Sequence, residues 1–490
     1  MPGYAVDEAF ARSREVFARA VEWLAGPEAA GLGHAAVEEG LAARGREMQR
    51  LLFQDYLDAR AAAEPRREQV TGPDGVCRRR AEPGHARPLS SVFGPVRVRR
   101  IAYRAPGARN VHPADEQLSL PAGQHSHGLA KLVASAAARG SLAAACAEIT
   151  ARTGCALGTR QCQQLARAAA ADFDGFYAAR RPPPGAAPGD VLVLELDAKG
   201  IAVLPGLQRP RSARAARKSA PKQDGRLSRG EVRTRKRMAE VAAVFDLAPV
   251  PRTAAAILDP GPRPPAPRAA GKWLTASIAA RAAEVAAAAF AEADRRDPAR
   301  QRTWIALADG NKDQIRWIRA QAAARGITIT ITIDVIHVTE YLWDAAWCFY
   351  PEASPEAGPW VRDHLRAILD GRARQVAAAL RDAAAAQLSA AKRKAAARTA
   401  AYLETNAPFL DYPRALAAGW PISTGVIEGA CRYLVKDRMA ITGARWGIQT
   451  AEAILKLRAL HANGDFDEYW AYHLHREHQR NHQPSLALAA

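Results

Sequence analysis

The chain has few of the features that mark secreted or membrane proteins. Its six cysteines form no CxxC pair and no close, even spacing, so neither a disulfide framework nor a zinc knuckle is expected. No run approaches the roughly 20 apolar residues that a membrane span requires. The N-terminal segment is amphipathic and charged, without the apolar stretch of a signal peptide. We therefore expect reduced thiols, a cytoplasmic location and no membrane partner.

Acidic residues are scarce relative to basic ones. Asp and Glu number 50 against 69 Lys and Arg, so the formal net charge is +19. Such an excess predicts a polyanionic partner, and nucleic acid is favoured over a membrane surface. The excess is densest in residues 205–240, where 12 Lys and Arg accompany three Asp and Glu. A run of this kind is usually a solvated loop, and an arm that grips phosphates is the functional alternative.

The 490 residues correspond to about three domains at roughly 150 residues each. Residues 1–127 are expected to be mainly helical, with a basic hairpin at 92–103 where apolar and basic residues alternate. Residues 128–180 predict two helices, 141–150 and 159–173, joined by a Gly-containing turn. This pattern is typical of a DNA-binding helix-turn-helix, although any αα-hairpin shares it.

A Pro-rich linker at 181–190 precedes a region of different character. Residues 191–339 predict the order βββαβαβ, which indicates an α/β fold with a mixed sheet. The predicted strands are 191–197, 200–206, 239–249, 303–309 and 327–334, and an Ala-rich helix is expected at 271–295. Residues 340–415 are interpreted as an all-α insertion domain, and residues 416–490 as the last part of the core with C-terminal helices.

Three acids stand out by position. Asp197 ends the first predicted strand, Asp309 ends the fourth, and Glu428 lies in the first turn of a late helix. If the first and fourth strands are neighbours, the carboxylates can converge and hold two Mg²⁺ or Mn²⁺ ions. Structural alternatives exist: an Asp after a strand forms turns, and Glu428 could pair with Arg432 at i,i+4. Glu195 shares a strand face with Asp197 and is an alternative extra carboxylate of the site, although a structural pairing with Lys or Arg is favoured for it.

Several segments carry a resemblance to a known family. The segment PISTGVIEGACRYLVKDRMAITGARWGIQTAEAILKLRALHANGDFDEYW (421–470) resembles the C-terminal block of the ISKra-type bacterial insertion-sequence transposases. The resemblance continues through FGPVRVRRIAY, RGSLAAACAEITARTG, LELDAKG and ALADGNKDQI. It implies a DDE transposase with an RNase H-like core, in which Asp197, Asp309 and Glu428 are the catalytic residues and the ligands of two Mg²⁺ or Mn²⁺ ions.

A further motif is similar to the Mutator-like group. In that group a Cys or Asp, two residues and a His often follow the second acid, as Asp334 and His337 do here. Asp334 also ends a predicted strand, so it is the alternative second acid. We favour Asp309, because Asp-Gly after the strand and before a polar helix start matches the family pattern. The chain departs from relatives at Ala198, where they carry Gly, and in the expanded loop 205–240.

The resemblance predicts an enzyme that binds the terminal inverted repeats of an insertion sequence, cleaves DNA strands and transfers the 3′-hydroxyl ends into target DNA. Its partner would be double-stranded DNA in the bacterial nucleoid, bound by a homodimer or higher oligomer. The alternatives are an RNase H-like nuclease or resolvase without strand transfer, and a domesticated DNA-binding protein without catalysis. The expected DNA contacts are Lys199, Arg235, Lys236, Arg237, Arg432, Lys436, Arg438, Arg445 and Trp446.

Overall fold

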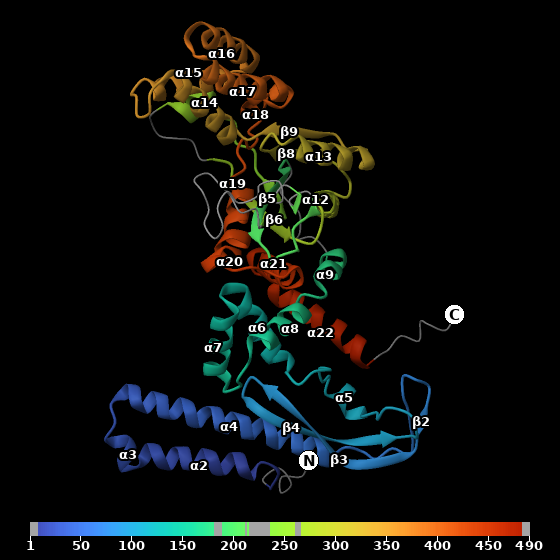
Figure 1. Ribbon diagram of the computed structural model, residues 1–490. Coiled ribbons are helices and arrows are strands. Elements are labelled where there is room, and N and C mark those ends of the chain that lie inside the picture. The colour runs from blue at the N-terminus through green and yellow to red at the C-terminus, as the bar shows by residue number, and fades with distance from the viewer. Residues whose placement is uncertain (1–7, 181–188, 211–212, 215–235, 260–265, 483–490) are drawn as a thin grey trace. The chain divides into compact units, whose positions relative to one another are not determined.

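The computed structural model describes residues 8–180, 189–210, 213–214, 236–259 and 266–482 (Figure 1). The chain divides into two compact units. The first combines Met1–Ala178 with Asp465–Ala490, and the second is Ala179–Gly464. The expected grouping of residues 416–490 with the core therefore holds only as far as Gly464. Most of the basic loop 205–240 lies outside the described residues.

The first unit consists of helices and two small antiparallel ladders. Its helices are α2 (Ala11–Ala25), α3 (Pro27–Ala30), α4 (His34–Ala62), α5 (Pro113–Gln117), α6 (His127–Arg139), α7 (Leu142–Thr153), α8 (Thr159–Ala169), α9 (Phe173–Ala179) and α22 (Phe466–His482). Its strands are β1 (Val70–Thr71), β2 (Cys77–Arg78), β3 (Arg80–Ser91) and β4 (Gly94–Arg104). The buried cluster that joins α4 to the β3–β4 hairpin is Leu57, Leu89, Val96, Val98 and Leu120.

The β3–β4 hairpin corrects the expected hairpin at 92–103. That segment supplies only the turn and the second strand, and the partner strand β3 lies before it. Gly94 adopts a φ of +119° at the turn, a conformation that an L side chain rarely adopts. Along β4 the valines are buried while Arg97 and Arg99 are exposed, as the two-residue period of a strand requires. The expected basic face is therefore present.

The two helices expected between 141 and 173 are present as α7 and α8, and α6 packs against both. Ser141 caps α7 by accepting a hydrogen bond from the Ala144 N–H at 3.0 Å. Gly154 ends α7 with a φ of +71°, which a glycine adopts without strain. Helix α8 exposes the polar side chains of Arg160 and Gln164. The two expected helices and the turn between them are therefore confirmed, and their assignment as a DNA-binding helix-turn-helix stays a prediction.

The C-terminal helix α22 is held to the first unit by a buried carboxylate. Asp172 accepts hydrogen bonds from the Nδ1 of His473 at 2.7 Å and from Arg480 at 2.6 and 2.9 Å. Tyr469 of the same helix donates to the Ala169 carbonyl at 2.6 Å. These contacts explain why α22 belongs with residues from the N-terminal half of the chain.

A five-stranded mixed sheet lies at the centre of the second unit. Its strands are β5 (Val191–Ala202), β6 (Lys236–Leu247), β7 (Ala269–Ser277), β8 (Trp304–Ala308) and β9 (Ile329–Ile333). Their order in the sheet is β7-β6-β5-β8-β9. The pairs β5–β6 and β6–β7 are antiparallel, whereas β5–β8 and β8–β9 are parallel. The fold class is thus α/β with a mixed sheet, and the first expected strand does neighbour the fourth.

Two strand assignments from the sequence were wrong. The segments 191–197 and 200–206 were expected to be separate strands, but β5 runs without interruption from Val191 to Ala202. The third strand of the sheet, β7, lies partly in the segment expected to be an Ala-rich helix, and that helix begins only at Ala282. The expected strand 239–249 is present as β6, and the expected number of five strands is correct because one strand was divided in two and another was missed. The short helix α11, which was not expected, lies between β6 and β7.

Helices connect and cover the strands. They are α11 (Ala254–Leu258), α12 (Ala282–Arg296), α13 (Lys312–Arg325), α14 (Val335–Phe349), α15 (Ala357–Leu369), α16 (Ala373–Gln387), α17 (Ala390–Asn406), α18 (Tyr412–Ala417), α19 (Gly425–Ala430), α20 (Asp437–Met439) and α21 (Ile448–Asn463), with a π-helical turn at Cys431–Lys436. The segment expected to be an all-α insertion forms helices α14 to α18, which stand together beside β9 (Figure 1). Within the described residues, no helix is long and apolar enough to cross a membrane.

Candidate functional site

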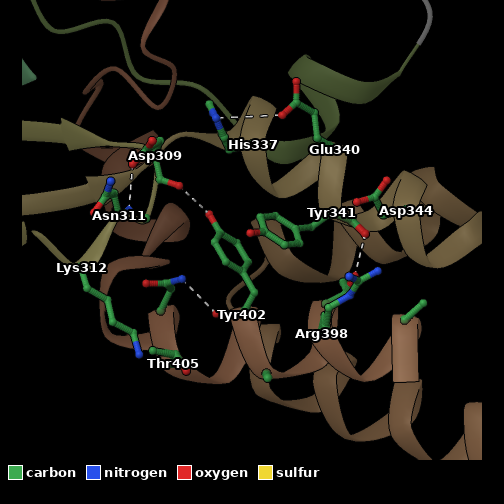
Figure 2. A pocket seen from close by; sticks show the side chains of 15 residues that line it. Asp309, Asn311, Lys312, His337, Glu340, Tyr341, Asp344, Arg398, Tyr402 and Thr405 are labelled. Carbon is green, nitrogen blue, oxygen red and sulfur yellow. Dashed lines mark hydrogen bonds and ion pairs between the residues drawn. The ribbon is translucent and has the colours of Figure 1, made fainter. Parts of the chain in front are cut away.

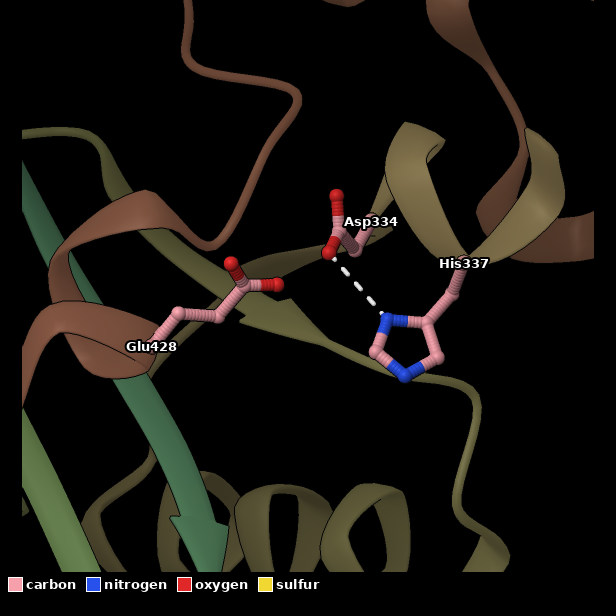
Figure 3. Close-up of side chains that lie close together, drawn as sticks. All are labelled: Asp334, His337 and Glu428. Atoms are coloured by element: carbon pink, nitrogen blue, oxygen red, sulfur yellow. Dashed lines mark hydrogen bonds and ion pairs between the residues drawn. The ribbon is translucent and has the colours of Figure 1, made fainter. Parts of the chain in front are cut away.

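Three potential metal ligands come together where the sheet meets two helices (Figure 3). One ligand atom from each of Asp334, His337 and Glu428 lies within 4.8 Å of the other two. Asp334 follows β9 and caps α14, His337 lies in the first turn of α14, and Glu428 belongs to α19. The group therefore joins residues on either side of the helical insertion.

Asp334 is fully buried and its oxygens are engaged by protein donors. Oδ1 accepts the Ile336 N–H at 2.9 Å, which caps α14. Oδ2 accepts the Thr424 hydroxyl at 2.6 Å and lies 3.2 Å from His337 Nδ1. Because Thr424 immediately precedes α19, Asp334 links the start of α14 to the start of α19. The sequence predicts Asp334 as the alternative second acid, and the structure shows that its carboxylate also accepts hydrogen bonds at the starts of α14 and α19.

The acids around His337 favour the charged form of its imidazole. The hydrogen bond to Asp334 raises the pKa of the imidazole to about 9 in spite of partial burial, and the charges of Asp309 and Glu340 contribute. A protonated imidazole donates from both nitrogens and cannot ligate a metal. The His337 ring therefore partly neutralises the acids around it.

Asp197 and Asp309 lie at the same edge of the sheet. Strands β5 and β8 are parallel, and their last paired residues are Glu195 and Leu307. Asp197 follows Glu195 by two residues and Asp309 follows Leu307 by two residues, so the two acids lie at equivalent positions on neighbouring strands. Asp197 accepts the Ala198 N–H on Oδ1 at 2.7 Å and the Cys431 thiol on Oδ2 at 3.2 Å. Neither Asp belongs to the group within 4.8 Å around Asp334.

The acids of the two strands and of α19 repel one another. Burial raises the pKa of Asp309, and the charge of Asp197 adds to the effect, while the Asn311 N–H that binds Asp309 Oδ1 at 2.8 Å opposes it. Burial also raises the pKa of Glu428, with contributions from Asp334 and Asp197. Asp197, Asp309, Asp334 and Glu428 thus share one electrostatic environment, and a bound cation would relieve their repulsion.

Glu195 is a buried acid within β5, two residues before Asp197. Its side chain accepts the Ile427 N–H on Oε2 at 2.7 Å, and the residue is 1% exposed. Burial raises the pKa of Glu195 to about 8, and repulsion from Asp334 and Glu428 adds to the shift. The expected ion pair with Lys or Arg is not found within the described residues. The only signal was an acid inside the otherwise apolar run VLVLELD.

A cavity of about 780 Å³ opens beside Asp309 and His337 (Figure 2). The core contributes the turn that carries Lys312, and the insertion contributes α17 with Arg398. The rings of Tyr341 and Tyr402 are stacked with centroids 3.8 Å apart, and the Tyr402 hydroxyl donates to the Asp309 carbonyl at 3.1 Å. No local sequence pattern predicts this cavity, because its walls are about 90 residues apart in the chain.

Some of the expected DNA contacts are exposed. The exposed side chains are Lys199, Lys236, Arg432, Lys436 and Arg445. Arg432 does not pair with Glu428 as the structural alternative proposed. Its nearest acid is Asp437 at 3.9 Å, five residues away, which matches the π-helical turn between them. Arg432 therefore does not neutralise the Glu428 carboxylate, which lies close to Asp334 and His337.

Other expected DNA contacts are engaged within the protein. Arg438 is 3% exposed and its guanidinium lies over the Trp446 ring at 4.8 Å, while the Trp446 indole N–H donates to the Met439 carbonyl. Arg237 donates to the Ile278 carbonyl at 2.8 Å. Arg438 and Trp446 are thus packing residues here, because their surfaces are covered. Arg235 lies outside the described residues.

The donor set suits a hard divalent cation. The acids offer carboxylate oxygens, which Mg²⁺ and Mn²⁺ prefer, and the one histidine in the group is held in its protonated form. Glu195 Oε1 is buried without a hydrogen-bond partner among the described residues, so an additional oxygen donor is available. No family model and no curated protein matches the chain. What the site can do is therefore inferred from its own residues.

Proposed function

We propose that this chain is a DDE-type DNA transposase, which cleaves the ends of an insertion sequence and joins their 3′-hydroxyls to target DNA. The observation that carries the proposal is that Asp197 of β5 and Asp309 after β8 lie toward the same end of two neighbouring parallel strands, while Glu428 of α19 has a ligand atom within 4.8 Å of one on Asp334, which follows the next strand, β9. A cation bound among these acids would offset the negative charge that gathers there.

The topology of the second unit supports an RNase H-like core. Three antiparallel strands are followed by two parallel ones, and the first strand lies between the second and the fourth. In this sheet the carboxyl end of β8 lies beside the middle of β5, so Asp309 after β8 lies near Asp197 within β5. The long helical insertion before Glu428 also fits a transposase, because a minimal nuclease core does not need it.

Asp197, Asp309 and Glu428 would hold two Mg²⁺ or Mn²⁺ ions. Such a pair supplies an activated attacking oxygen and stabilises the leaving oxygen of a phosphodiester. Asp309 remains the favoured second acid, because the oxygens of Asp334 are already engaged by Ile336, Thr424 and His337. The role of Asp334 is to hold the starts of α14 and α19 together, so that Glu428 faces the two strand acids.

Both units offer surfaces for DNA. The cavity beside Asp309 is within the size range of small-molecule sites and has room for a nucleotide, with Lys312 and Arg398 available to a phosphate. Lys199 is exposed on β5, which also carries Asp197, and Lys436 is exposed on the π-helical turn that follows α19. In the first unit, α8 would read the terminal repeats and the basic face of β4 would contact the backbone. A homodimer would bring two ends together.

The proposal is tested with purified chain, labelled element ends and Mg²⁺. We expect strand cleavage at the ends and, with target DNA present, joined products. Asp197→Asn should abolish both, whereas Asp370→Asn, which alters an exposed acid paired with Arg372, should change neither. Cleavage without joining would favour the nuclease or resolvase alternative. Binding of the ends without cleavage would favour a DNA-binding protein that has lost catalysis.

A further inference from the structure

A groove runs along helix α13, away from the acidic site. Its first part is the cavity beside Asp309, and two further cavities of about 310 and 560 Å³ continue it. The first and second cavities share Lys312 and Thr405 in their walls, and the second and third share Arg319 and Phe409. Because neighbouring cavities have walls in common, the three form one continuous groove. It follows most of the 14 residues of α13, a helix about 21 Å long.

One face of α13 forms a wall of this groove. The wall residues recur three or four positions apart, which places them on the same side of the helix. Lys312, Arg316 and Arg319 are exposed on this face, while Ile315 and Ala322 between and beyond them are buried. The opposite wall comes from the end of α17 and from α18. Helix α13 thus presents a row of cations to the groove above an apolar floor.

Three of the cations in the groove have no acidic partner. Among the described residues, no carboxylate forms an ion pair with Lys312, Arg319 or Arg414. The guanidinium of Arg319 lies over the Phe409 ring at 4.9 Å, and that of Arg414 lies over the Trp420 ring at 5.3 Å. A cation–π contact orients a guanidinium without neutralising its charge. The two arginines are therefore held in place while their charge stays available to an anion.

The far end of the groove follows an edge of the sheet. Among the described strands, β9 pairs with β8 alone. The Asp334 N–H donates to the Ala308 carbonyl of β8, so the peptide groups of Ile329 and Ile331, which alternate with it, face away from β8. They open toward the third cavity, which residues 327–332 line. Unpaired bases carry donors and acceptors on their edges that can bind such groups.

We propose that this groove binds one strand of DNA beside the acidic site, with Lys312, Arg319 and Arg414 on its phosphates. The inference rests on the proposed function for the choice of DNA. Asp411 is the one acid in the walls of the second and third cavities, so the cations there require a polyanion. Each cavity has the size of a small-molecule site, which a single nucleotide enters and a paired duplex does not. A polypeptide added to the β9 edge would leave the three cations unmatched.

The test uses the full chain in chelator with a dye-labelled oligothymidylate as the probe. Arg319→Gln with Arg414→Gln removes two cations of the groove. Arg362→Gln with Arg374→Gln is the matched control, because these exposed arginines lie on α15 and α16 outside the three cavities. Fluorescence anisotropy at several salt concentrations measures the affinity. We expect the groove pair to weaken binding about tenfold and to flatten the slope of log affinity against log salt by about 1.4, or about 0.7 for each lost phosphate contact. The control pair should change the affinity less than about twofold.

A second measurement locates the strand on the wild-type chain. An oligothymidylate that carries a photoreactive thiothymidine is irradiated on the protein, and the cross-linked peptides are identified by mass spectrometry. We expect cross-links within residues 312–331 and 402–420.

The inference is overturned if the cross-links fall only elsewhere or if the two pairs of substitutions weaken binding alike, and the β9 edge is then left for a polypeptide. It is also overturned if the groove pair weakens binding of a duplex as much as that of the single strand, because the cations then contact paired DNA. The proposed function fails separately, if the strand binds in the groove but the wild type neither cleaves nor joins element ends.

Discussion

The identity of the second catalytic acid can be tested by comparing Asp309→Asn with Asp334→Asn, because the two carboxylates have opposite surroundings. Asp309 is partly buried and repelled by Asp197, and its Oδ1 accepts the Asn311 N–H. Asp334 is fully buried and has three hydrogen-bonding partners. Removing the charge should therefore relieve repulsion at Asp309 and break favourable contacts at Asp334.

The magnitudes follow from these contacts. In Asp334→Asn the amide oxygen can still cap α14, since Asn is as good an N-cap as Asp. The amide nitrogen cannot accept from Thr424 and His337, and a hydrogen bond to a charged group contributes about 1.5–3 kcal/mol. Because the His337 side chain is 35% exposed, solvent screens part of the free energy that its hydrogen bond to Asp334 contributes. We expect Asp334→Asn to lower the free energy of unfolding by about 2 kcal/mol and Tm by about 4–8 °C.

Asp309→Asn should not lower Tm as Asp334→Asn does. The introduced asparagine still accepts the Asn311 N–H, so Tm in chelator should stay unchanged or rise. Mn²⁺ affinity should fall at least tenfold, which is about 1.4 kcal/mol, and cleavage should be abolished.

Calorimetry, Mn²⁺ titration and cleavage of labelled ends measure these effects for both variants. Nuclear magnetic resonance should in addition show the pKa of His337 falling from about 9 toward its ordinary value of 6.5 in Asp334→Asn. The reasoning is refuted if Asp309→Asn cleaves normally while Asp334→Asn has lost cation binding. Asp334 would then be the second acid.

Three further predictions concern other parts of the chain. Glu428→Gln should abolish cleavage and joining while repeat binding in a gel-shift assay stays nearly intact, and a variant that still cleaves with Mg²⁺ would remove Glu428 from the site. Deleting 209–237 should flatten the slope of log affinity against log salt, because fewer counterions are released, and an unchanged slope would show that this segment does not contact DNA. In the first unit, burial opposes the charge on Asp172, but hydrogen bonds from Arg480 and His473 outweigh it and lower the pKa of Asp172. The contribution of Asp172 to the free energy of unfolding is therefore complete above the pKa of Asp172 in the unfolded chain, near 3.9, and is lost as the pH falls through its lower pKa in the folded protein. Asp172→Asn should cost roughly 1–3 kcal/mol at neutral pH and should remove this part of the acid sensitivity in urea unfolding, whereas equal acid sensitivity in both proteins would contradict the assignment.

Local sequence pattern predicted the core strands well where it was strong. The runs that became β5, β8 and β9 are dense in apolar residues, as buried strands are. The strand β7 was missed, because AAGKWLTAS begins with small residues and precedes an Ala-rich helix. Propensity cannot separate a buried strand from the start of a helix in such a segment. Its strand state comes from pairing with β6.

The sequence by itself determined which acids follow apolar runs and which residue types are available to a cation. Asp197 and Asp309 could be selected because each closes an apolar run, and the expectation that their strands can be neighbours is confirmed by the sheet order. Tertiary structure alone decided that Asp334 faces Glu428, that Glu195 lies under α19, and that Trp446 is covered rather than exposed. The physical reason is distance along the chain: these contacts cross the helical insertion or join β5 to the C-terminal block, so no local periodicity encodes them.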